Sequence, residues 1–471
     1  MTNKFLITLI GALTSKPYAF TARSWELKNT ETIDLFDSIC SNIRIDTRGS
    51  EIMRILPVNN EELNEEWISD KTRFAYDGLK RKRFINPMIK EQNLFRQTSW
   101  KNILTILEKE FNNKIFNKFI IETGNFNDLE HLTSIDDLRN VTSNIIINPN
   151  KYINADLQTY YTINKSSLKE IGPKIYILVG INLRLENPIL NIKFKKLSQT
   201  HSILIAYIGS KYNYNINLLH LGNNLSTLIE IIKGKHKFCT IAQNFLKKNN
   251  INLRIDNSFK NNIYIIFGNE FNQIKNKEKI ITVLEQYKKL PLKFELGILQ
   301  LYTGTINKLE LGLFDNYNHI IKNNEANLYY LLNNESTKNL KDNDFVIFQG
   351  THNEKMRSKF NVILPSSNWT EKNALYLNCF GIIQKTQKVI SSPINVRSDW
   401  QITQILKLWL NKDKEQFNAS SISILNGIHK RLNELSPNLM NSISNYTINE
   451  NQKLKIKYKS TSHKPKKIRK N

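Results

Sequence analysis

Short hydrophobic runs bounded by glycine or polar residues recur through the chain from about residue 100 onward. Such runs are typical of parallel strands that are buried on both faces. They lie at residues 118–122, 175–180, 202–209, 263–268, 326–332 and 345–350. Hydrophobic residues at helical spacing predict a helix over 103–116, and other helical stretches separate the strands. This alternation predicts a Rossmann-like α/β region with parallel sheets, which we assign to residues 96–440.

The first 95 residues have a different pattern. Hydrophobic and polar residues alternate over 41–46 and again over 51–57, and Gly49 lies in the turn between these segments, so a β-hairpin is expected. Residues 441–471 become polar and then strongly basic, which is typical of a loosely ordered tail. The predicted fold is therefore α/β, with a short β-rich N-terminal region (1–95) before the α/β region and a basic tail after it.

The composition is that of a globular protein, with 40% hydrophobic and 23% charged residues. No hydrophobic run approaches the roughly 20 residues that span a bilayer. The longest runs, Phe5–Leu13 and Ile175–Leu183, suit buried strands, so direct membrane insertion is not expected. The N-terminus lacks the Arg- and Ser-rich stretch of a mitochondrial presequence. If the protein works in mitochondria, we therefore expect that its gene is in the mitochondrial genome.

The formal net charge of +25 has two possible explanations. One is a negatively charged partner, such as nucleic acid or an acidic protein surface. The other is mutational drift toward A and T in the gene, which enriches Lys, Asn and Ile and leaves few Ala, Gly and Pro. The charge is spread along the chain, apart from the basic end at Lys453–Lys470, and this spread favours drift.

The three cysteines, Cys40, Cys239 and Cys379, lie far apart and form no Cys-x-x-Cys pair. A [4Fe–4S] cluster usually takes four thiolates, and nothing in the spacing of Cys and His suggests a zinc site. We therefore interpret all three as buried free thiols in a reducing compartment.

Known sequence patterns for catalysis and nucleotide binding are missing from the chain. Neither Gly-x-Gly-x-x-Gly nor Gly-x-x-x-x-Gly-Lys-Ser/Thr occurs, and the segment 209–211 lacks the upstream glycine of a phosphate loop. The histidines weighed as candidates are His201, His220, His236 and His352. His352 is the best placed, because it follows a predicted strand and has Glu354 near it, but no nucleophile elbow accompanies it.

The remaining chemical candidates favour structural roles. Glu61 and Glu62, like Glu65 and Glu66, are adjacent in sequence and suit a solvated or docking surface better than acid–base catalysis. The tryptophans 67, 100 and 369 are interpreted as core or interface anchors. We therefore predict no catalytic residue, no cofactor-binding residue and no metal ligand in this chain.

One long N-terminal stretch resembles a known family. Its residues are Gly11–Arg23 with Trp25–Leu27, then 41–44, 53–57 and 64–81. These segments resemble the large (75 kDa) iron–sulfur subunits of NADH:ubiquinone oxidoreductase, the respiratory complex I. Weaker similarity at 178–186, 362–378 and 436–439 extends the resemblance to about residue 440.

The resemblance implies a fold of the molybdopterin oxidoreductase type from which the redox chemistry is gone. Family members begin with a cluster-bearing region, and Thr8 stands where the last cysteine of that region is expected. Cys40 alone lies near a further cluster position of bacterial members, and Phe380–Ile382 replaces a Glu-Gly-Arg pattern. The chain is therefore expected to be the second half of a split subunit that binds no cofactor, with the iron–sulfur clusters in a separate N-terminal partner polypeptide.

The implied function is that of a non-catalytic structural domain on the matrix arm of mitochondrial complex I, with other matrix-arm subunits as partners. We further hypothesise that Trp67 and its acidic neighbours lie at the contact with the cluster-bearing half. Two alternatives are an active molybdopterin-dependent oxidoreductase and a basic organellar nucleic-acid-binding protein. The first needs metal ligands and phosphate loops, and the second needs clustered basic and aromatic residues on one surface.

Overall fold

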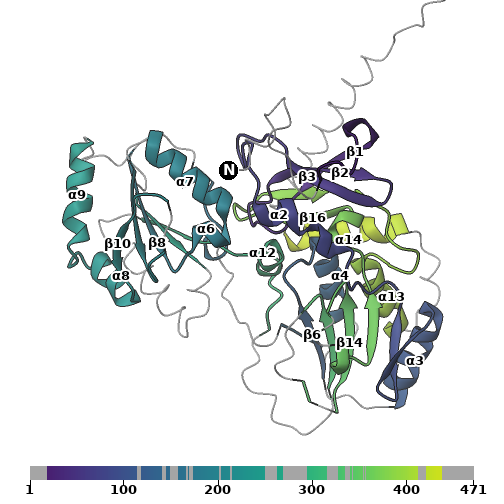
Figure 1. Ribbon diagram of the computed structural model, residues 1–471. Helices are drawn as coiled ribbons and strands as arrows, with labels where there is room; N and C mark the ends of the chain where they lie inside the picture. Colours follow the sequence, from purple (N-terminus) through teal and green to yellow (C-terminus); the bar gives the residue numbers. More distant parts are fainter. Residues whose placement is uncertain are drawn as a thin grey trace, which may run out of the picture.

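The computed structural model describes most of the chain. The described residues are 18–113, 118–140, 145–148, 158–165, 168, 173–200, 203–212, 215–249, 263–268, 294–315, 327–334, 340–341, 343–353, 355, 357–411 and 421–436. Within them, the strands form two large, mainly parallel sheets that share one hydrophobic cluster, and a small antiparallel sheet lies beside one of the two (Figure 1). The predicted basic tail lies outside these residues.

The small sheet contains β1 (Lys28–Ile33), β2 (Asn42–Arg48) and β3 (Glu51–Pro57), paired antiparallel in that order. Gly49 has a φ of 63° in the turn between β2 and β3, a backbone conformation that glycine adopts without strain. The predicted hairpin is therefore confirmed. The 3₁₀-helix η1 (Ser24–Glu26) precedes this sheet, and α2 (Asp70–Phe74) and η2 (Ala75–Leu79) follow it.

Seven strands form the larger sheet, which we call sheet C. Their order is β5-β4-β15-β14-β13-β6-β7. They are β4 (Met88–Glu91), β5 (Leu94–Gln97), β6 (Phe119–Thr123), β7 (Ile145–Ile147), β13 (Leu328–Leu332), β14 (Phe345–Gly350) and β15 (Val362–Pro365). The strands from β15 to β7 are parallel, whereas β4 and β5 form an antiparallel hairpin at the edge. Because β6 has β7 on one side and β13 on the other, the chain reverses its direction of winding between β6 and β13.

The second parallel sheet, sheet D, is inserted between β7 and β13 of sheet C. Its strand order is β10-β9-β8-β11-β12. The strands are β8 (Lys174–Val179), β9 (Ile203–Ile208), β10 (Leu219–Gly222), β11 (Ile263–Phe267) and β12 (Phe294–Ile298). All four pairings are parallel. Both predicted strand runs at 175–180 and 263–268 thus lie at the centre of this sheet.

Helices cover both faces of sheet D because alternate side chains of its strands point in opposite directions. The helices are α6 (Leu183–Glu186), α7 (Pro188–Thr200), α8 (Leu225–Ile232) and α9 (Phe238–Lys248). On one face, Tyr176 packs edge-on against Phe194 of α7, with ring centroids 5.0 Å apart. On the other face, Ile177 lies in a hydrophobic cluster with Leu228 of α8 and Phe238 of α9.

Five helices and a short hairpin accompany sheet C. They are α3 (Trp100–Asn113), α4 (Leu129–Arg139), α12 (Thr303–Glu310), α13 (Asp399–Asn411), α14 (Ser421–Leu435), β16 (Ala374–Leu377) and β17 (Ile383–Thr386). The 3₁₀-helices are η3 (Gln158–Tyr160), η4 (Arg357–Lys359) and η5 (Trp369–Glu371). Helix α4 packs against α13 and α14 and is buried along most of its length.

The α/β fold class predicted from the hydrophobic pattern is confirmed, with its β-rich N-terminal region and two parallel sheets. The helix predicted over 103–116 is α3, which begins three residues earlier; residues 114–117 lie outside the described ones. No helix in the described part of the chain is long and apolar enough to cross a membrane.

Candidate functional site: a pocket at the ends of the sheet C strands

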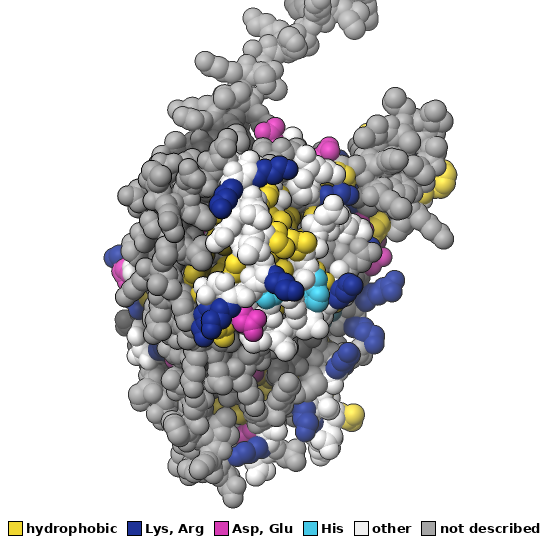
Figure 2. Space-filling view, turned by 90° about the vertical axis from the view of Figure 1, so that its left-hand side faces the viewer, with side chains coloured by type: hydrophobic (Ala, Val, Ile, Leu, Met, Phe, Trp, Pro, Cys, Tyr) yellow, Lys and Arg dark blue, Asp and Glu magenta, His cyan; other side chains and the backbone are white. Residues whose placement is uncertain are grey.

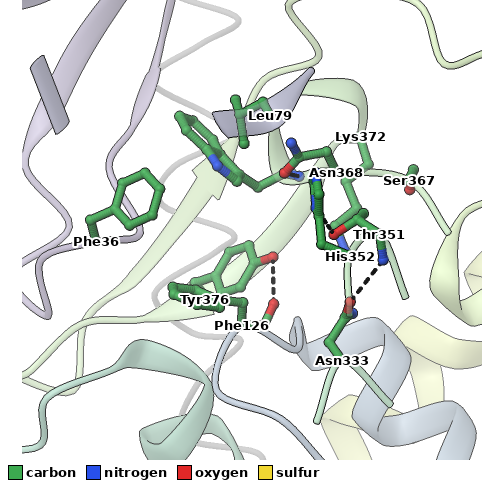
Figure 3. A pocket seen from close by; sticks show the side chains of 11 residues that line it. Phe36, Leu79, Phe126, Asn333, Thr351, His352, Ser367, Asn368, Lys372 and Tyr376 are labelled. Carbon is green, nitrogen blue, oxygen red and sulfur yellow. Dashed lines mark hydrogen bonds between the residues drawn. The ribbon is translucent and has the colours of Figure 1, made fainter. Parts of the chain in front are cut away.

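A pocket of about 200 Å³ lies beyond the carboxyl ends of β13, β14 and β15, next to the reversal between β6 and β13 (Figure 3). Proteins with open parallel sheets bind ligands in such crevices, so this pocket is the candidate ligand-binding site. The pocket is lined by Phe36, Leu79, Phe126, Asn333, Thr351, His352, Ser367, Asn368, Trp369, Lys372 and Tyr376. Phe36 lies in the loop between β1 and β2, and Leu79 lies at the end of η2. The N-terminal region therefore closes one side of the pocket.

Aromatic rings build one wall of this pocket. Phe36 packs edge-on against Phe126 and against Trp369, with centroid distances of 6.0 Å and 6.2 Å. Trp369 lies in the hydrophobic core, as expected from the sequence. Tyr376 donates a hydrogen bond from its hydroxyl to the carbonyl of Phe126 at 3.3 Å (Figure 3). These contacts within the chain fix the positions of the rings that form the wall.

His352, the histidine that the sequence placed best, does line the pocket directly after β14. Its Nδ1 lies 2.9 Å from Oγ1 of Thr351. Burial, together with the nearby Arg83 guanidinium, lowers the pKa of His352, so the neutral imidazole predominates at neutral pH. The hydroxyl of Ser367 has no hydrogen-bond partner among the described residues, so these two do not form a nucleophile–base pair. Glu354 lies outside the described residues.

Lys372, which lines the pocket, is buried between two carboxylates. Its Nζ donates to Oδ2 of Asp399 at 2.5 Å and to Oδ2 of Asp128. Burial alone would lower the pKa of Lys372, but the two carboxylates raise it well above its ordinary value. The same ammonium holds the pKa of Asp399 below its ordinary value despite burial. The amine is therefore held as a charged ammonium group between the two carboxylates.

The ends of three elements meet at this buried cluster. Asp128 is the N-cap of α4, where its side chain accepts a hydrogen bond from the backbone N–H of His131 at 2.7 Å. Asp399 is the first residue of α13, and Lys372 follows η5 directly. Carboxylates are favoured at helix N-termini, which explains both aspartates locally. This cluster was not predicted from the sequence, where its visible signal is an aspartate, Asp128, directly before the hydrophobic start of α4.

A second buried ion pair joins the N-terminal region to η5. The guanidinium of Arg83 donates from both terminal nitrogens to Glu371, at 2.5 Å and 2.6 Å. Only 8% of the Arg83 side chain and 1% of the Glu371 side chain are exposed. Such a two-bonded pair fixes both position and orientation. It holds the segment before β4 against the strand-end loops of sheet C.

The loop between β1 and β2 buries two acids and a thiol beside Cys379. Burial and the neighbouring Asp34 raise the pKa of Asp37 to about 7, and burial raises the pKa of Asp34 to about 6. Burial raises the pKa of the Cys40 thiol, and proximity to Cys379 raises it further. The backbone N–H of Cys379 donates to the Ser38 carbonyl at 2.7 Å. Cys40 and Cys379 are buried, as predicted, whereas Cys239 is only partly buried, so the prediction that all three are buried is wrong for Cys239.

The other candidates from the sequence have structural contacts. His220 Nε2 lies 3.1 Å from the carbonyl of Gly209, and His236 Nδ1 accepts from the N–H of Phe238 at the start of α9. Glu62 pairs with Lys165 and Glu65 with Lys196. His201 lies outside the described residues. Among those that are described, no three His, Cys, Asp or Glu side chains are grouped closely enough to hold a metal ion.

Comparison with known proteins gives two family matches. The molybdopterin oxidoreductase model matches residues 83–407, and the model of the 4Fe-4S domain of NDSU1/NuoG-like NADH-ubiquinone oxidoreductases matches residues 27–77. The second match corrects one expectation: iron–sulfur domains are not confined to a separate N-terminal polypeptide, because this chain carries a domain of that type itself.

Curated proteins similar to this chain are named as NADH-ubiquinone oxidoreductase subunits or as an NADH dehydrogenase [ubiquinone] iron-sulfur protein. One is the NADH-ubiquinone oxidoreductase 75 kDa subunit of Reclinomonas americana, 36% identical over 92% of this chain and 63% of that protein. Another is NADH dehydrogenase [ubiquinone] iron-sulfur protein 1 of Solanum tuberosum, 32% identical over 93% of this chain and 58% of that protein. The 78 kDa subunit of Candida albicans is 32% identical over 92% and 58%. The chain thus spans about three-fifths of the length of these relatives.

The residues that the structure describes fit neither group that the two family matches imply. Residues 27–77 contain one cysteine, Cys40, whose raised pKa favours the protonated thiol, whereas a [4Fe–4S] cluster takes four thiolates. The pocket below the strand ends of sheet C is smaller than the roughly 300–1,000 Å³ of usual cofactor sites, and no cysteine lines it. Its lysine is already neutralised by carboxylates of the chain.

Proposed function

This chain belongs to the molybdopterin oxidoreductase family, and from that premise we propose that it is a structural domain of the 75 kDa iron–sulfur subunit of mitochondrial complex I. The observation that carries the proposal is the 36% identity to a 75 kDa subunit along 92% of the chain. In this role the chain supports electron transfer from NADH to ubiquinone without an active site of its own. Two residues of the pocket support the lack of an active site. Lys372 is paired with carboxylates of the chain itself, and the hydroxyl of Ser367 has no hydrogen-bond partner among the described residues that could activate it.

The proposed partners are the other subunits of the matrix arm, together with the part of the 75 kDa subunit that this sequence does not cover. Two aromatic side chains beside β1–β3 favour a contact there. Phe20 is fully exposed and Trp25 is 79% exposed, although aromatic residues of this size are usually buried. Exposed aromatics of this kind are typical anchors of protein interfaces. The region 1–95 would then be the contacting domain, 96–440 the α/β body and 441–471 the tail.

The proposed location is the matrix side of the inner mitochondrial membrane, as a peripheral part of the complex. The mitochondrial names of two relatives support this location. We also propose that the gene lies in the mitochondrial genome, which the Lys-, Asn- and Ile-rich composition favours. Labelling of the chain in isolated mitochondria, and its loss when organellar ribosomes are inhibited, would test the second point.

A native gel of solubilised mitochondrial membranes tests the function. The chain, identified by mass spectrometry, is expected to migrate with NADH-oxidising activity. A denaturing second dimension then shows whether it runs near 55.1 kDa or as part of a larger polypeptide. Migration away from that activity would contradict the proposal. Molybdenum in the migrating species would favour an active molybdopterin enzyme, and nuclease-sensitive migration would favour a nucleic-acid-binding protein.

A further inference from the structure

The outer side of sheet D carries a basic surface built from α8, α9 and the turn between them. Its lysines, which we call the α8–α9 basic face, are Lys233, Lys235, Lys237, Lys247 and Lys248, and all five are exposed. Glu230 is the one acidic residue between Leu225 and Asn249. Figure 2 looks onto this side of the molecule, where Lys and Arg side chains outnumber acidic ones and surround hydrophobic side chains.

Among the described residues, these lysines differ from many others in having no acidic partner. Elsewhere, Lys80 lies 2.5 Å from Glu51, and Lys196 lies 3.0 Å from Glu65. Within the part of the chain that the structure describes, none of the five ammonium groups of the α8–α9 basic face lies within 4.0 Å of a carboxylate. Lys233, Lys235 and Lys237 lie within five residues of one another, and like charges so close together repel, which destabilises the isolated chain slightly. A partner with negative charge would remove that repulsion.

A hydrophobic side chain lies among these lysines. Ile241 is 45% exposed on α9, four residues after Lys237 and seven before Lys248, so the three share one side of the helix. A hydrophobic centre with a charged rim is typical of a protein interface. Single-stranded nucleic acid would instead be met by exposed aromatic rings, and the aromatic residues of α9, Phe238 and Phe245, are buried or partly buried. The face also contains no arginine, the residue best suited to phosphate.

We propose that the α8–α9 basic face docks an acidic surface of a neighbouring protein subunit, with Ile241 as the hydrophobic contact at its centre. For the identity of the assembly, this inference rests on the proposed function. The docking itself follows from the charge and exposure of the two helices. Because the contact is largely electrostatic, it should weaken as the salt concentration rises.

Zero-length carbodiimide cross-linking of the isolated native complex tests the proposal, because it joins only amines and carboxylates in direct contact. Lysines of the α8–α9 basic face are expected to link to Asp or Glu of an identified subunit of the same complex. The internal pair of Lys196 with Glu65 is the positive control, since it should link within the chain. If that control links and the five lysines link to no other polypeptide, the inference is wrong. Ultraviolet cross-links from α9 to nucleic acid would also overturn it.

A charge-reversed variant provides the second measurement. Lys235→Glu with Lys237→Glu should weaken the contact roughly tenfold or more, seen as release from the complex at lower salt. Lys235→Arg with Lys237→Arg should leave it unchanged. The matched control is Lys101→Glu with Lys109→Glu, two exposed positions on α3. Equal release of both reversed variants would overturn this inference, whereas absence of the unmodified chain from complex I would overturn the proposed function instead.

Discussion

At the scale of single residues, Lys372 shows how a charge can be buried in this fold. Its ammonium lies between Asp128 and Asp399, and all three side chains are almost completely buried. Removing one member of such a cluster leaves a buried charge without an opposite charge beside it. The resulting loss of folding stability is far larger than the net stability that the intact cluster contributes. The cluster therefore couples the start of α4 and the start of α13 to η5.

Replacing Lys372 with Met should lower stability by about 3–5 kcal/mol, because two buried carboxylates then face each other without a cation. Thermal unfolding of the purified chain measures the loss. Lys388→Met is the matched control, since Lys388 is exposed and its replacement should change stability by less than about 0.5 kcal/mol. Similar melting temperatures for the two variants would show that the buried cluster is not a stabilising element.

Asp37 predicts a pH dependence whose sign can be worked out. Burial raises its pKa in the folded chain to about 7, from an ordinary value of 3.8. The folded state therefore holds this proton more tightly than the unfolded chain does, and stability falls as pH rises from about 4 to about 7. Asp37→Asn should leave stability unchanged near pH 4 and raise it by up to roughly 4 kcal/mol at pH 8.

Urea unfolding of wild type and Asp37→Asn at both pH values checks this prediction. Asparagine keeps an oxygen that can accept from the N–H of Ile39, as Asp37 does at 3.0 Å. Asp77→Asn, at an exposed acid on η2, should show no such pH-dependent gain. If Asp37→Asn raised the free energy of unfolding equally at pH 4 and pH 8, the gain could not come from the ionisation of Asp37.

The sequence could not have predicted these residue clusters, because their members are brought together only by the completed fold. Lys372 and Asp128 are 244 positions apart. Cys40 and Cys379 come from opposite ends of the chain, and their spacing carries no sign that they meet. His352 was predicted correctly at a strand end, because the carboxyl edge of a parallel sheet can be inferred locally.

At the scale of elements, buried strands were the best predicted features. In a parallel sheet covered by helices, nearly every strand residue is hydrophobic, so β8, β11 and β14 stand out in the sequence. Helix α4 did not stand out, because it is buried on nearly all sides and includes buried His131 and Ser134, so it has no polar stripe. The β4–β5 hairpin was also missed, since its residues are mostly exposed or half-buried.

Gly304 lies where α12 approaches the loop after β6. A Cβ added there would overlap the carbonyl of Asn125 and lie 2.9 Å from the backbone nitrogen of Asn127. Because both obstacles are backbone, Gly304→Ala should destabilise the protein by roughly 1–3 kcal/mol. Gly427 on α14 has open space instead, so Gly427→Ala should stabilise by about 0.5–1 kcal/mol. Opposite shifts in melting temperature are expected, and shifts of the same sign would contradict this reasoning.

At the scale of the whole molecule, replacing Trp25 tests the proposed interface, because its side chain is exposed and its loss should affect binding and not folding. Trp25→Ala should weaken association with the complex roughly tenfold or more, while the melting temperature of the free chain stays unchanged, because the side chain is exposed. Ile422→Ala, at an exposed hydrophobic residue on α14, is the control. Native gels over a salt series measure the association. Unchanged retention of Trp25→Ala would exclude this surface as an anchor.

Trp67, which the sequence suggested as an interface residue, is partly buried and packs against the chain's own core. Its role at an interface stays a prediction. Trp67→Ala should lower both stability and co-purification, so it cannot separate the two effects as Trp25→Ala does.

Strand order in sheet C was beyond prediction from the sequence, because the sheet is assembled from segments on either side of sheet D. Hydrophobic runs identify strands but carry little information on which strand pairs with which. The hydrophobic pattern predicted the α/β class and the resemblance to a known family added the molybdopterin oxidoreductase type, whereas the position of the pocket is set only by the completed fold.

The insertion of sheet D also sets an order of events on the ribosome. Every strand from β8 to β12 is synthesised before β13, so sheet D can be complete while sheet C still consists of β4 to β7. During that interval β6 presents an open edge where β13 will later pair. Such an edge can pair with another nascent chain, so we expect the pocket-bearing half of the molecule to be the part that depends most on chaperones during synthesis.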